Sequence, residues 1–430
     1  MIGRLANIDG LHVVSRTSVM RFKDSKLSLP ELAKSLNVDA VVEGSVIREG
    51  TRIRVSAQLI NASSDTHLFS STYDREFQQV LALESDVAQD IARKVEVTVS
   101  GRERERLAAQ RAVSPEVYES YLMGRYGLNR SQVKVAVEES IGHFEDAIRA
   151  DSSFAPAYIS LAQAYQMLGT VYSGEPMANV LPKMSEAIQK AIELDPDSSD
   201  AHVVLGDFDE ATWKWAEAEA EYRRALDLNP NSALACASFS SWFLVQGRFD
   251  EALQYARRGR QLDPFTVSGD DIGNILFHAR RFDESIHEIE ADLSLEPNDA
   301  AKLWSLGFSL IANQQAADAV TVLEKSALLS QRSPGVLGVL VRGYAEAGRR
   351  NDAFAILTEL KGRQKKGFVP AGALVNAYLG LGDKKEAMNW LEQAYRERST
   401  IVTFVKVHPF FDPLRSDPRF VELQRKLGLQ

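Results

Sequence analysis

The chain has 430 residues and a mass of 47.7 kDa, which is too long for one compact core and suggests two or three domains unless repeats extend it. A composition of 45% hydrophobic and 25% charged residues is that of an ordinary folded protein, and the formal charge of −9 argues against electrostatic binding of nucleic acid or an anionic membrane. The single cysteine, Cys236, excludes an intramolecular disulfide and a thiolate metal cluster, so we expect a small core residue there.

Residues 1–99 have the pattern of a small α/β or α+β domain. The expected elements are, in chain order, a strand over 11–19, a helix starting at Ser28, a hairpin of 40–48 and 52–60, a third strand over 67–73 and a helix over 80–99. The helix start rests on Ser28 followed by Pro30 and Glu31. The hairpin rests on alternating apolar residues on both sides of Gly50.

Two sequence phrases in this region are specific: VVSRTSV at 13–19 and VDAVVEGSVIREGTRIRVSAQLINASSDTHLFSSTYDREF at 38–77. They resemble the TolB-like amino-terminal domain that bacterial proteins carry beside arrays of helical repeats. Members of that family usually begin with an additional strand and most of a helix before the part that matches 5–11. The resemblance therefore implies a fragment or a misplaced start, or else a partner that supplies the strand and covers the exposed sheet edge.

A charged stretch, 100–114, follows and contains GRERERLAAQR. Because glutamates interrupt its arginines, we interpret it as a solvated helical linker and not as a basic binding patch. The first two helix pairs come next, and both have long connections. In the first pair the connection lies between Leu122 and Ser140, and in the second it covers 169–182, where it is either a lid or a simple surface excursion.

A repeat then becomes visible. Pro196, Pro230 and Pro264 are spaced by 34 residues, and Pro297 follows after 33. Five residues before the first three of these prolines lie small residues, Ala191, Ala225 and Gly259, which let two helices approach closely. This pattern resembles the tetratricopeptide repeat, one helix-turn-helix per unit. The resemblance implies eight helix pairs over 115–400, stacked into a superhelix with a concave inner face.

The ending HPFFDPLRSDPRFVELQRKLGL at 408–429 resembles endings of the same bacterial repeat proteins, in which it packs as a terminal cap. A solenoid needs such a cap, because its final repeat otherwise exposes an apolar side. The predicted fold class is mainly α, an α-solenoid after a small, incomplete α/β domain. The predicted boundaries are 1–99 for the α/β domain, 100–114 for the linker, 115–400 for the superhelix and 401–430 for the cap.

Sequence patterns for catalysis are absent. The chain has no GxxxxGK[ST] or GxGxxG phosphate loop, no GxSxG nucleophile elbow and no protein-kinase phrases. Its seven histidines are scattered and lack metal-ligand spacing. We therefore expect no enzymatic activity, no cofactor and no metal.

The concave face is the candidate site. The resemblance places on it Gln163, Gln166, Asp207, Leu244, Val245, Asn274, Phe277, His278, Trp304, Phe308, Ile311, Arg342 and Asn376. Asn274 and Asn376 match an asparagine that in many relatives binds the backbone of a peptide. Trp304, Phe308 and Phe277 would add an apolar anchor pocket, and Arg342 would face an acidic side chain. In the alternative interpretation, the aromatic residues fill the packing between repeats.

The predicted function is a scaffold that binds a protein or peptide segment through Asn274, Phe277, Trp304, Phe308, Arg342 and Asn376. The alternative is the sensory or regulatory half of a bacterial signalling or transcriptional regulator whose output domain lies outside this chain. We expect no binding of nucleic acid, and the oligomeric state stays open. No apolar run approaches the roughly 18 residues that span a bilayer, so we expect a cytoplasmic protein, or a periplasmic one if a membrane segment lies upstream.

Overall fold

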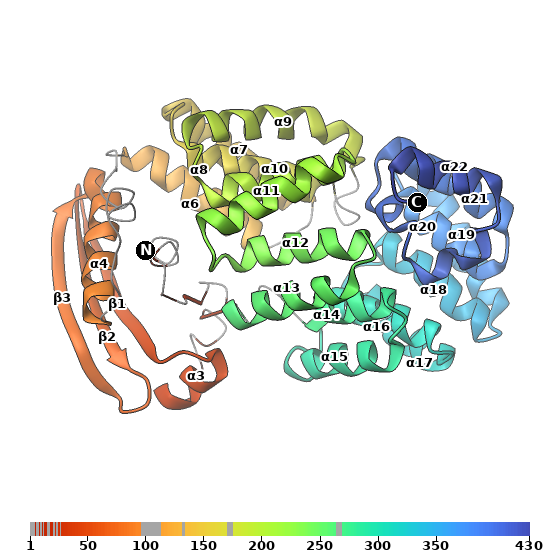
Figure 1. Cartoon of the computed structure of the whole chain (residues 1–430), viewed down its shortest axis with the longest axis horizontal. Helices are drawn as coiled ribbons and strands as arrows, with labels where there is room; N and C mark the ends of the chain where they lie inside the picture. The colour runs from red at the N-terminus through yellow and green to blue at the C-terminus, as the bar shows by residue number, and fades with distance from the viewer. Residues whose placement is uncertain are drawn as a thin grey trace.

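The computed structural model describes residues 27–95, 113–130, 134–169, 175–263 and 269–430, together with isolated positions before residue 27. A small sheet lies at one end of the molecule, and a curved array of helices makes up the rest (Figure 1). The predicted class, mainly α with a small sheet at the amino-terminal end, is confirmed.

The amino-terminal part has a simple element order. It comprises α3 (Leu29–Leu36), β1 (Ala40–Glu49), β2 (Arg52–Asn61), β3 (Thr66–Glu76), a 3₁₀ turn η1 (Phe77–Gln79) and α4 (Val80–Lys94). The three strands pair antiparallel in the order β1-β2-β3, so the predicted hairpin and third strand are confirmed. Helix α3 begins as expected, because the Glu31 carboxylate accepts hydrogen bonds from the backbone N–H and the hydroxyl of Ser28, at 2.8 and 2.6 Å.

Apolar and polar residues alternate along the strands, which gives the sheet one apolar face. Ile53, Ala57 and Leu59 point to the same side of β2 and pack with Leu83 and Val87 of α4 in one buried cluster. Figure 1 shows α4 lying along this face. The sheet is thus covered on one side by the helix that follows it in the sequence.

The strand expected over 11–19 is wrong at the positions described there. Leu11, Val13 and Val14 have no regular structure, and Ser18 and Val19 are helical. A short β-branched run forms a strand only when it pairs with a neighbour, and the described sheet consists of β1, β2 and β3. The expected helical linker falls mainly on 101–112, outside the described residues, as does the end of the helix expected over 80–99.

The described ranges contain eight helix pairs, as predicted. They are α6 (Pro115–Arg130) and α7 (Lys134–Ala150), α8 (Ala155–Leu168) and α9 (Met177–Leu194), α10 (Ser199–Ala211) and α11 (Trp215–Leu228), α12 (Ala233–Val245) and α13 (Phe249–Leu262), α14 (Gly269–His278) and α15 (Phe282–Leu295), α16 (Ala300–Ala312) and α17 (Ala316–Leu329), α18 (Pro334–Glu346) and α19 (Arg350–Gln364), and α20 (Ala371–Leu381) and α21 (Lys384–Glu397). The helices of each pair pack against each other, and successive pairs stack.

Close helix contacts explain the small residues of the repeat. A Cβ atom on Gly206 would lie 2.6 Å from the Tyr222 ring, and one on Gly307 would lie 2.5 Å from the Leu323 side chain.

The turn between the two helices of each regular pair contains one residue in the left-handed backbone conformation. These residues, all with positive φ, are Trp213, Gly247, Arg280, Gln314, Gly348 and Gly382. The turn position therefore recurs every 33 or 34 residues, as the prolines do.

Both long connections were placed wrongly. The extra residues of the first pair lengthen its helices, because α6 and α7 have 16 and 17 residues against 13 and 14 in α10 and α11. In the second pair Pro182 lies inside α9, which begins at Met177. A proline inside a helix removes one backbone hydrogen bond, and α9 nevertheless continues through Pro182 to Leu194. The remaining connection, 170–174, lies outside the described residues.

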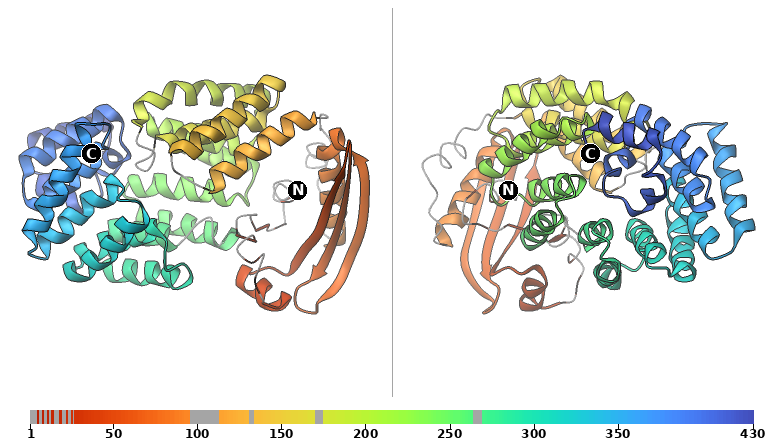
Figure 2. Two further views of the ribbon diagram at one scale, coloured as in Figure 1. Left: turned by 180° about the vertical axis from the view of Figure 1, so that it is seen from behind. Right: turned by 45° about the vertical axis from the view of Figure 1, so that its right-hand side comes forward.

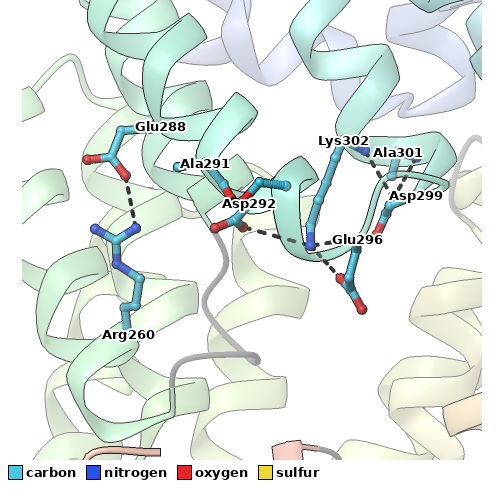
Figure 3. A network of polar contacts seen from close by, with 9 residues as sticks. Arg260, Glu288, Ala291, Asp292, Glu296, Asp299, Ala301 and Lys302 are labelled. Atoms are coloured by element: carbon cyan, nitrogen blue, oxygen red, sulfur yellow. Dashed lines mark hydrogen bonds and ion pairs between the residues drawn. The ribbon is translucent and has the colours of Figure 1, made fainter. Parts of the chain in front are cut away.

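A polar network fixes the turn between α15 and α16 (Figure 3). The Lys302 side chain is buried, and its ammonium lies 2.6 Å from the Glu296 carboxylate and 3.8 Å from those of Asp292 and Asp299. Asp299 also caps α16 by accepting hydrogen bonds from the backbone N–H groups of Ala301 and Lys302. One cation thus joins three acidic side chains at the junction of two repeats.

Residues 399–430, the C-terminal segment, comprise 3₁₀ turns η2 (Thr400–Phe404) and η3 (Pro409–Leu414) and helix α22 (Pro418–Leu427). The segment contacts α20 and α21, as expected of a cap on the last pair. It also runs back along the inside of the array, where the Trp215 indole N–H donates to the Leu427 carbonyl at 2.6 Å. Figure 2 shows this segment on the inner side of the curve. The segment thus contacts both the last helix pair and α11 of the third pair.

Candidate functional site

The C-terminal segment lies against the predicted binding face. His408 and Phe410 stand edge-on to Phe277, with ring centroids 5.3 and 5.7 Å away, and Phe308 lies 5.4 Å from Phe410. His408, Phe410 and Phe277 are all buried. The anchor pocket expected for a partner is thus partly filled by the chain's own aromatic side chains.

Arg342 is also engaged from within the chain. Its guanidinium carbon lies 3.5 Å from the centroid of the Phe410 ring, and its Nε donates to the Glu346 carboxylate at 2.7 Å. Burial lowers the pKa of Arg342, while the Glu346 charge acts in the opposite direction. Arg342 therefore faces an aromatic ring of the C-terminal segment, and its charge is balanced by its own helix.

The C-terminal segment is firmly held. Its buried apolar side chains are Val402, Val405, Val407, Phe410, Phe411, Leu414, Phe420, Leu423, Leu427 and Leu429. Each such side chain contributes about 1.5–3 kcal/mol when fully buried. An external peptide could therefore displace the segment only by burying a comparable apolar area.

A cavity of about 350 Å³ remains between the concave face and the C-terminal segment. From the repeats it is lined by Asp271, Asn274, Phe277, His278, Ala301, Trp304, Ser305, Phe308, Ser309, Gly335, Pro370, Gly372, Ala373 and Asn376, and from the C-terminal segment by Ser399, Thr400, Ile401, Phe404 and His408. Five of the six predicted binding residues meet here, on helices α14, α16 and α20. Arg342 is not among the lining residues.

The two asparagines differ in availability. Asn274 is half-buried, and its side-chain amide has no hydrogen-bond partner among the described residues. Asn376 is only 5% exposed, and its Oδ1 is sealed from solvent, again without a partner in the described part of the chain. Asn274 is thus the more accessible of the two side chains.

Two neutral histidines form part of the wall. The His278 Nδ1 lies 2.8 Å from the Asn274 carbonyl oxygen, which fixes the proton on Nδ1 and leaves Nε2 as an acceptor. Burial lowers the pKa of His278 to about 4. His408 lies 5.1 Å away, and burial with the nearby His278 lowers its pKa well below the usual value. Both imidazoles are therefore uncharged at neutral pH.

Sequence reasoning missed the contribution of Ile401, Phe404, His408 and Phe410 to this site. The available signal was the aromatic phrase HPFF at 408–411, which is unusually apolar for a simple surface ending. It lacks a helical period and gives no indication of its partners. Its contacts with Phe277 and Phe308 become visible only in three dimensions.

Other reactive groups lie elsewhere. Cys236 is buried, and burial raises the pKa of its thiol to about 11, which makes it unreactive. Tyr222 donates its hydroxyl proton to Asp207, and burial raises the pKa of the neighbouring Glu210 to about 8. Within the described ranges no group of three or more His, Cys, Asp or Glu residues is placed to hold a metal ion. A search of the same ranges finds no helix with the length and apolarity of a membrane span.

Comparison with known proteins identifies the repeats. Models of the tetratricopeptide repeat match residues 185–233 and 372–400. The first match covers the end of α9 with α10 and α11, and the second covers α20 and α21. These helix pairs are therefore tetratricopeptide repeats, a class of repeat that suggests protein partners.

Relatives share only part of their length with this chain. A protein of Rhizobium meliloti (strain 1021) named "Putative adenylate cyclase 3" is 29% identical over 206 residues, which are 48% of this chain and 35% of that protein. Superkiller protein 3 of Schizosaccharomyces pombe (strain 972) is 21% identical over 275 residues, 64% of this chain and 17% of that protein. The chain thus spans well under half the length of both.

Two solved structures are similar to this chain at low sequence identity. The crystal structure of the APC/C hetero-tetramer Cut9-Hcn1 aligns with 61% of this chain and 55% of its own, at 15% identity and a TM-score of 0.43. The structure of pilF from Pseudomonas aeruginosa aligns with 64% of this chain and 98% of its own, at 18% identity and a TM-score of 0.30.

Proposed function

We propose that this protein is a non-enzymatic scaffold that binds a segment of another protein at the concave face of its repeats. The observation that supports this most directly is the convergence of Asn274, Phe277, Trp304, Phe308 and Asn376 on one cavity. Aromatic side chains around a recess with a few polar groups are typical of binding sites and of the central residues of protein interfaces. The matched repeats, whose class suggests protein partners, add to this support.

The experiment that tests the proposal is affinity capture. The full chain is immobilised and exposed to a lysate of its source organism, and retained proteins are compared with those held by the double variant Trp304→Ala, Asn274→Ala. Both residues line the cavity and are only half-buried, so the helical content should be nearly unchanged. A matched control is Phe354→Ala, because Phe354 is 48% exposed and is not one of the cavity-lining residues.

A partner that the wild type and the control retain and the double variant loses would support the proposal. If the double variant retains the same proteins as the wild type, binding at this face is contradicted. A large loss of helical circular dichroism in the double variant would show instead that the two residues hold neighbouring repeats together, which is the packing interpretation.

A second candidate is the regulatory half of a signalling protein whose output domain lies outside this chain. It is favoured by the relative named as an adenylate cyclase, most of whose length lies outside the alignment. The TolB-like interpretation of the amino-terminal part belongs to this candidate as well. In the capture experiment, retention of a nucleotide cyclase or another output enzyme would favour it. Retention of proteins without such a domain would favour the scaffold.

A further inference from the structure

The cavity is a composite of two parts of the chain. Trp304 and Phe308 belong to the repeats, whereas Ile401 and Phe404 belong to the C-terminal segment. Phe404 stacks on His278 with ring centroids 4.9 Å apart, which ties the two parts together at the wall. The site is therefore complete only when the C-terminal segment occupies the concave face.

The C-terminal segment also limits what can enter. An extended peptide running along the concave face would meet His408 and Phe410, which already pack on Phe277 and Phe308. A volume of about 350 Å³ is at the small end of the range for ligand pockets. The space thus suits one or two side chains and not a continuous peptide.

The charges around the cavity exclude an anionic group. In the described part of the chain no lysine or arginine lines it, and Asp271 is the lining residue with a formal charge. The lining histidines, His278 and His408, are neutral at pH 7. A carboxylate placed here would lose its hydration without gaining a cationic partner, which is strongly unfavourable.

We infer that the cavity receives a single uncharged side chain of the partner, aromatic or large aliphatic, and that Ile401 and Phe404 of the C-terminal segment form one wall of its pocket. This inference rests on the proposed function and adds to it the chemistry of the partner's anchor residue. Trp304 and Phe308 supply the opposing apolar surface. The half-buried Asn274 amide is available to the peptide group beside the anchor.

Blocked amino acids test this chemistry without a known partner. The amides of N-acetyl-phenylalanine, N-acetyl-leucine, N-acetyl-glutamate and N-acetyl-lysine are titrated into the full chain by calorimetry and saturation-transfer NMR. We expect the two apolar probes to bind with dissociation constants on the order of 1 mM. The glutamate probe should bind at least about tenfold more weakly, because its carboxylate finds no cationic partner among the lining residues. The lysine probe should bind as weakly, because the lining carboxylate, Asp271, is exposed to solvent and compensates little for the lost hydration. Equal binding of a charged probe would overturn the inference.

Variants on both walls locate the site. Ser305→Leu fills the cavity from α16, and Ile401→Ala removes part of the wall from the C-terminal segment. Each should weaken binding of the phenylalanine probe by about fivefold or more, because the leucine occupies the probe's space and the alanine removes apolar contact. Phe354→Ala is the control and should bind as the wild type does. If Ser305→Leu fails to fold, Ile401→Ala still decides the matter, since unchanged binding in that variant would exclude the composite wall.

The inference and the proposed function can fail separately. If a captured partner depends on Trp304 and Asn274 but no apolar probe binds, the inference is wrong and the scaffold proposal stands. If apolar probes bind but no protein is captured through this face, the pocket chemistry stands and the scaffold proposal is wrong.

Discussion

Tyr395 of α21 stacks on Trp213, which lies in the turn between α10 and α11, with ring centroids 4.7 Å apart and an interplanar angle of 20°. Arg398 covers the same indole at 4.1 Å and donates a hydrogen bond to the Ala211 carbonyl, 187 positions earlier in the chain. The last repeat therefore returns to the third one, and the array closes on itself (Figures 1 and 2).

We expect Tyr395→Ala to loosen this closure. Aromatic pairs contribute about 0.5–1.5 kcal/mol beyond their buried area, so the free energy of unfolding should fall by about 1–2 kcal/mol. Small-angle X-ray scattering should show a larger radius of gyration. Trp390→Ala is the control on the same helix, because Trp390 lines a separate surface pocket beside Phe368. An unchanged scattering profile for Tyr395→Ala would mean that the C-terminal segment alone keeps the array closed.

The recurring left-handed turn gives a second prediction. Gly348 has φ of +78°, and a Cβ atom there would meet nothing within 4 Å, so Gly348→Ala isolates the backbone cost. That cost is about 1 kcal/mol. Gly362 in α19 is equally open but helical, and Gly362→Ala should stabilise the protein by about 0.5–1 kcal/mol. Urea unfolding of both variants measures these changes. If the free energy of unfolding changed in the same direction in Gly348→Ala and Gly362→Ala, the explanation would be contradicted.

The buried histidines predict acid sensitivity. His278 stays neutral in the folded protein down to about pH 4, whereas an unfolded histidine binds a proton near pH 6.5. The unfolded state thus binds more protons below pH 6.5, so the free energy of unfolding falls as the pH falls through this window. His278 alone should account for about 2 kcal/mol of the loss between pH 7.5 and pH 5, and His408 acts in the same direction.

The His278→Gln variant tests this by comparison. The raised pKa of Glu210 acts in the opposite direction but is present in both proteins, so it cancels in the difference. Urea titrations of both proteins at pH 7.5 and pH 5 should show the smaller pH-dependent loss in the variant. Parallel losses would mean that His278 does not carry the acid sensitivity.

Lys302 provides a test of the repeat junction. Lys302→Met keeps most of the buried side chain but removes the charge between Asp292, Glu296 and Asp299. These carboxylates are partly exposed, so we expect a loss of about 1–3 kcal/mol in the free energy of unfolding, less than for a fully buried pair. Lys325→Met is the control, because Lys325 is an exposed cation whose ammonium donates a hydrogen bond to the Pro297 backbone carbonyl. Equal losses in the two variants would show that the network has no special role.

The fold could largely be predicted because repeat contacts are local. The spacing of Pro196, Pro230 and Pro264 is enough to define the helix pairs, since each pair packs mainly on its neighbours. The second connection was misplaced because Pro182 was taken as the end of a loop. A proline inside a helix is unfavourable, so its sequence signal favours a loop, whereas α9 continues through it.

Only the part of the candidate site that the repeats supply could be predicted from the sequence. The repeat register brought Asn274, Trp304 and Phe308 to the concave face, where the structure has them. The other wall depends on Phe404 and His408, whose partners are remote in sequence and follow no period. The role proposed for Arg342 depended on an exposed guanidinium, whereas Phe410 and Glu346 already occupy it.

The bond between Trp215 and Leu427 spans 212 positions. In an ordinary solenoid each repeat can fold as soon as it leaves the ribosome, because it needs only its neighbour. Here the inner faces of the middle repeats stay uncovered until residues 399–430 have been synthesised, because that segment supplies the side chains that cover them. A nascent chain, or one cut before residue 399, would therefore expose the apolar surface around Phe277 and Phe308, the kind of surface that chaperones bind and that drives aggregation.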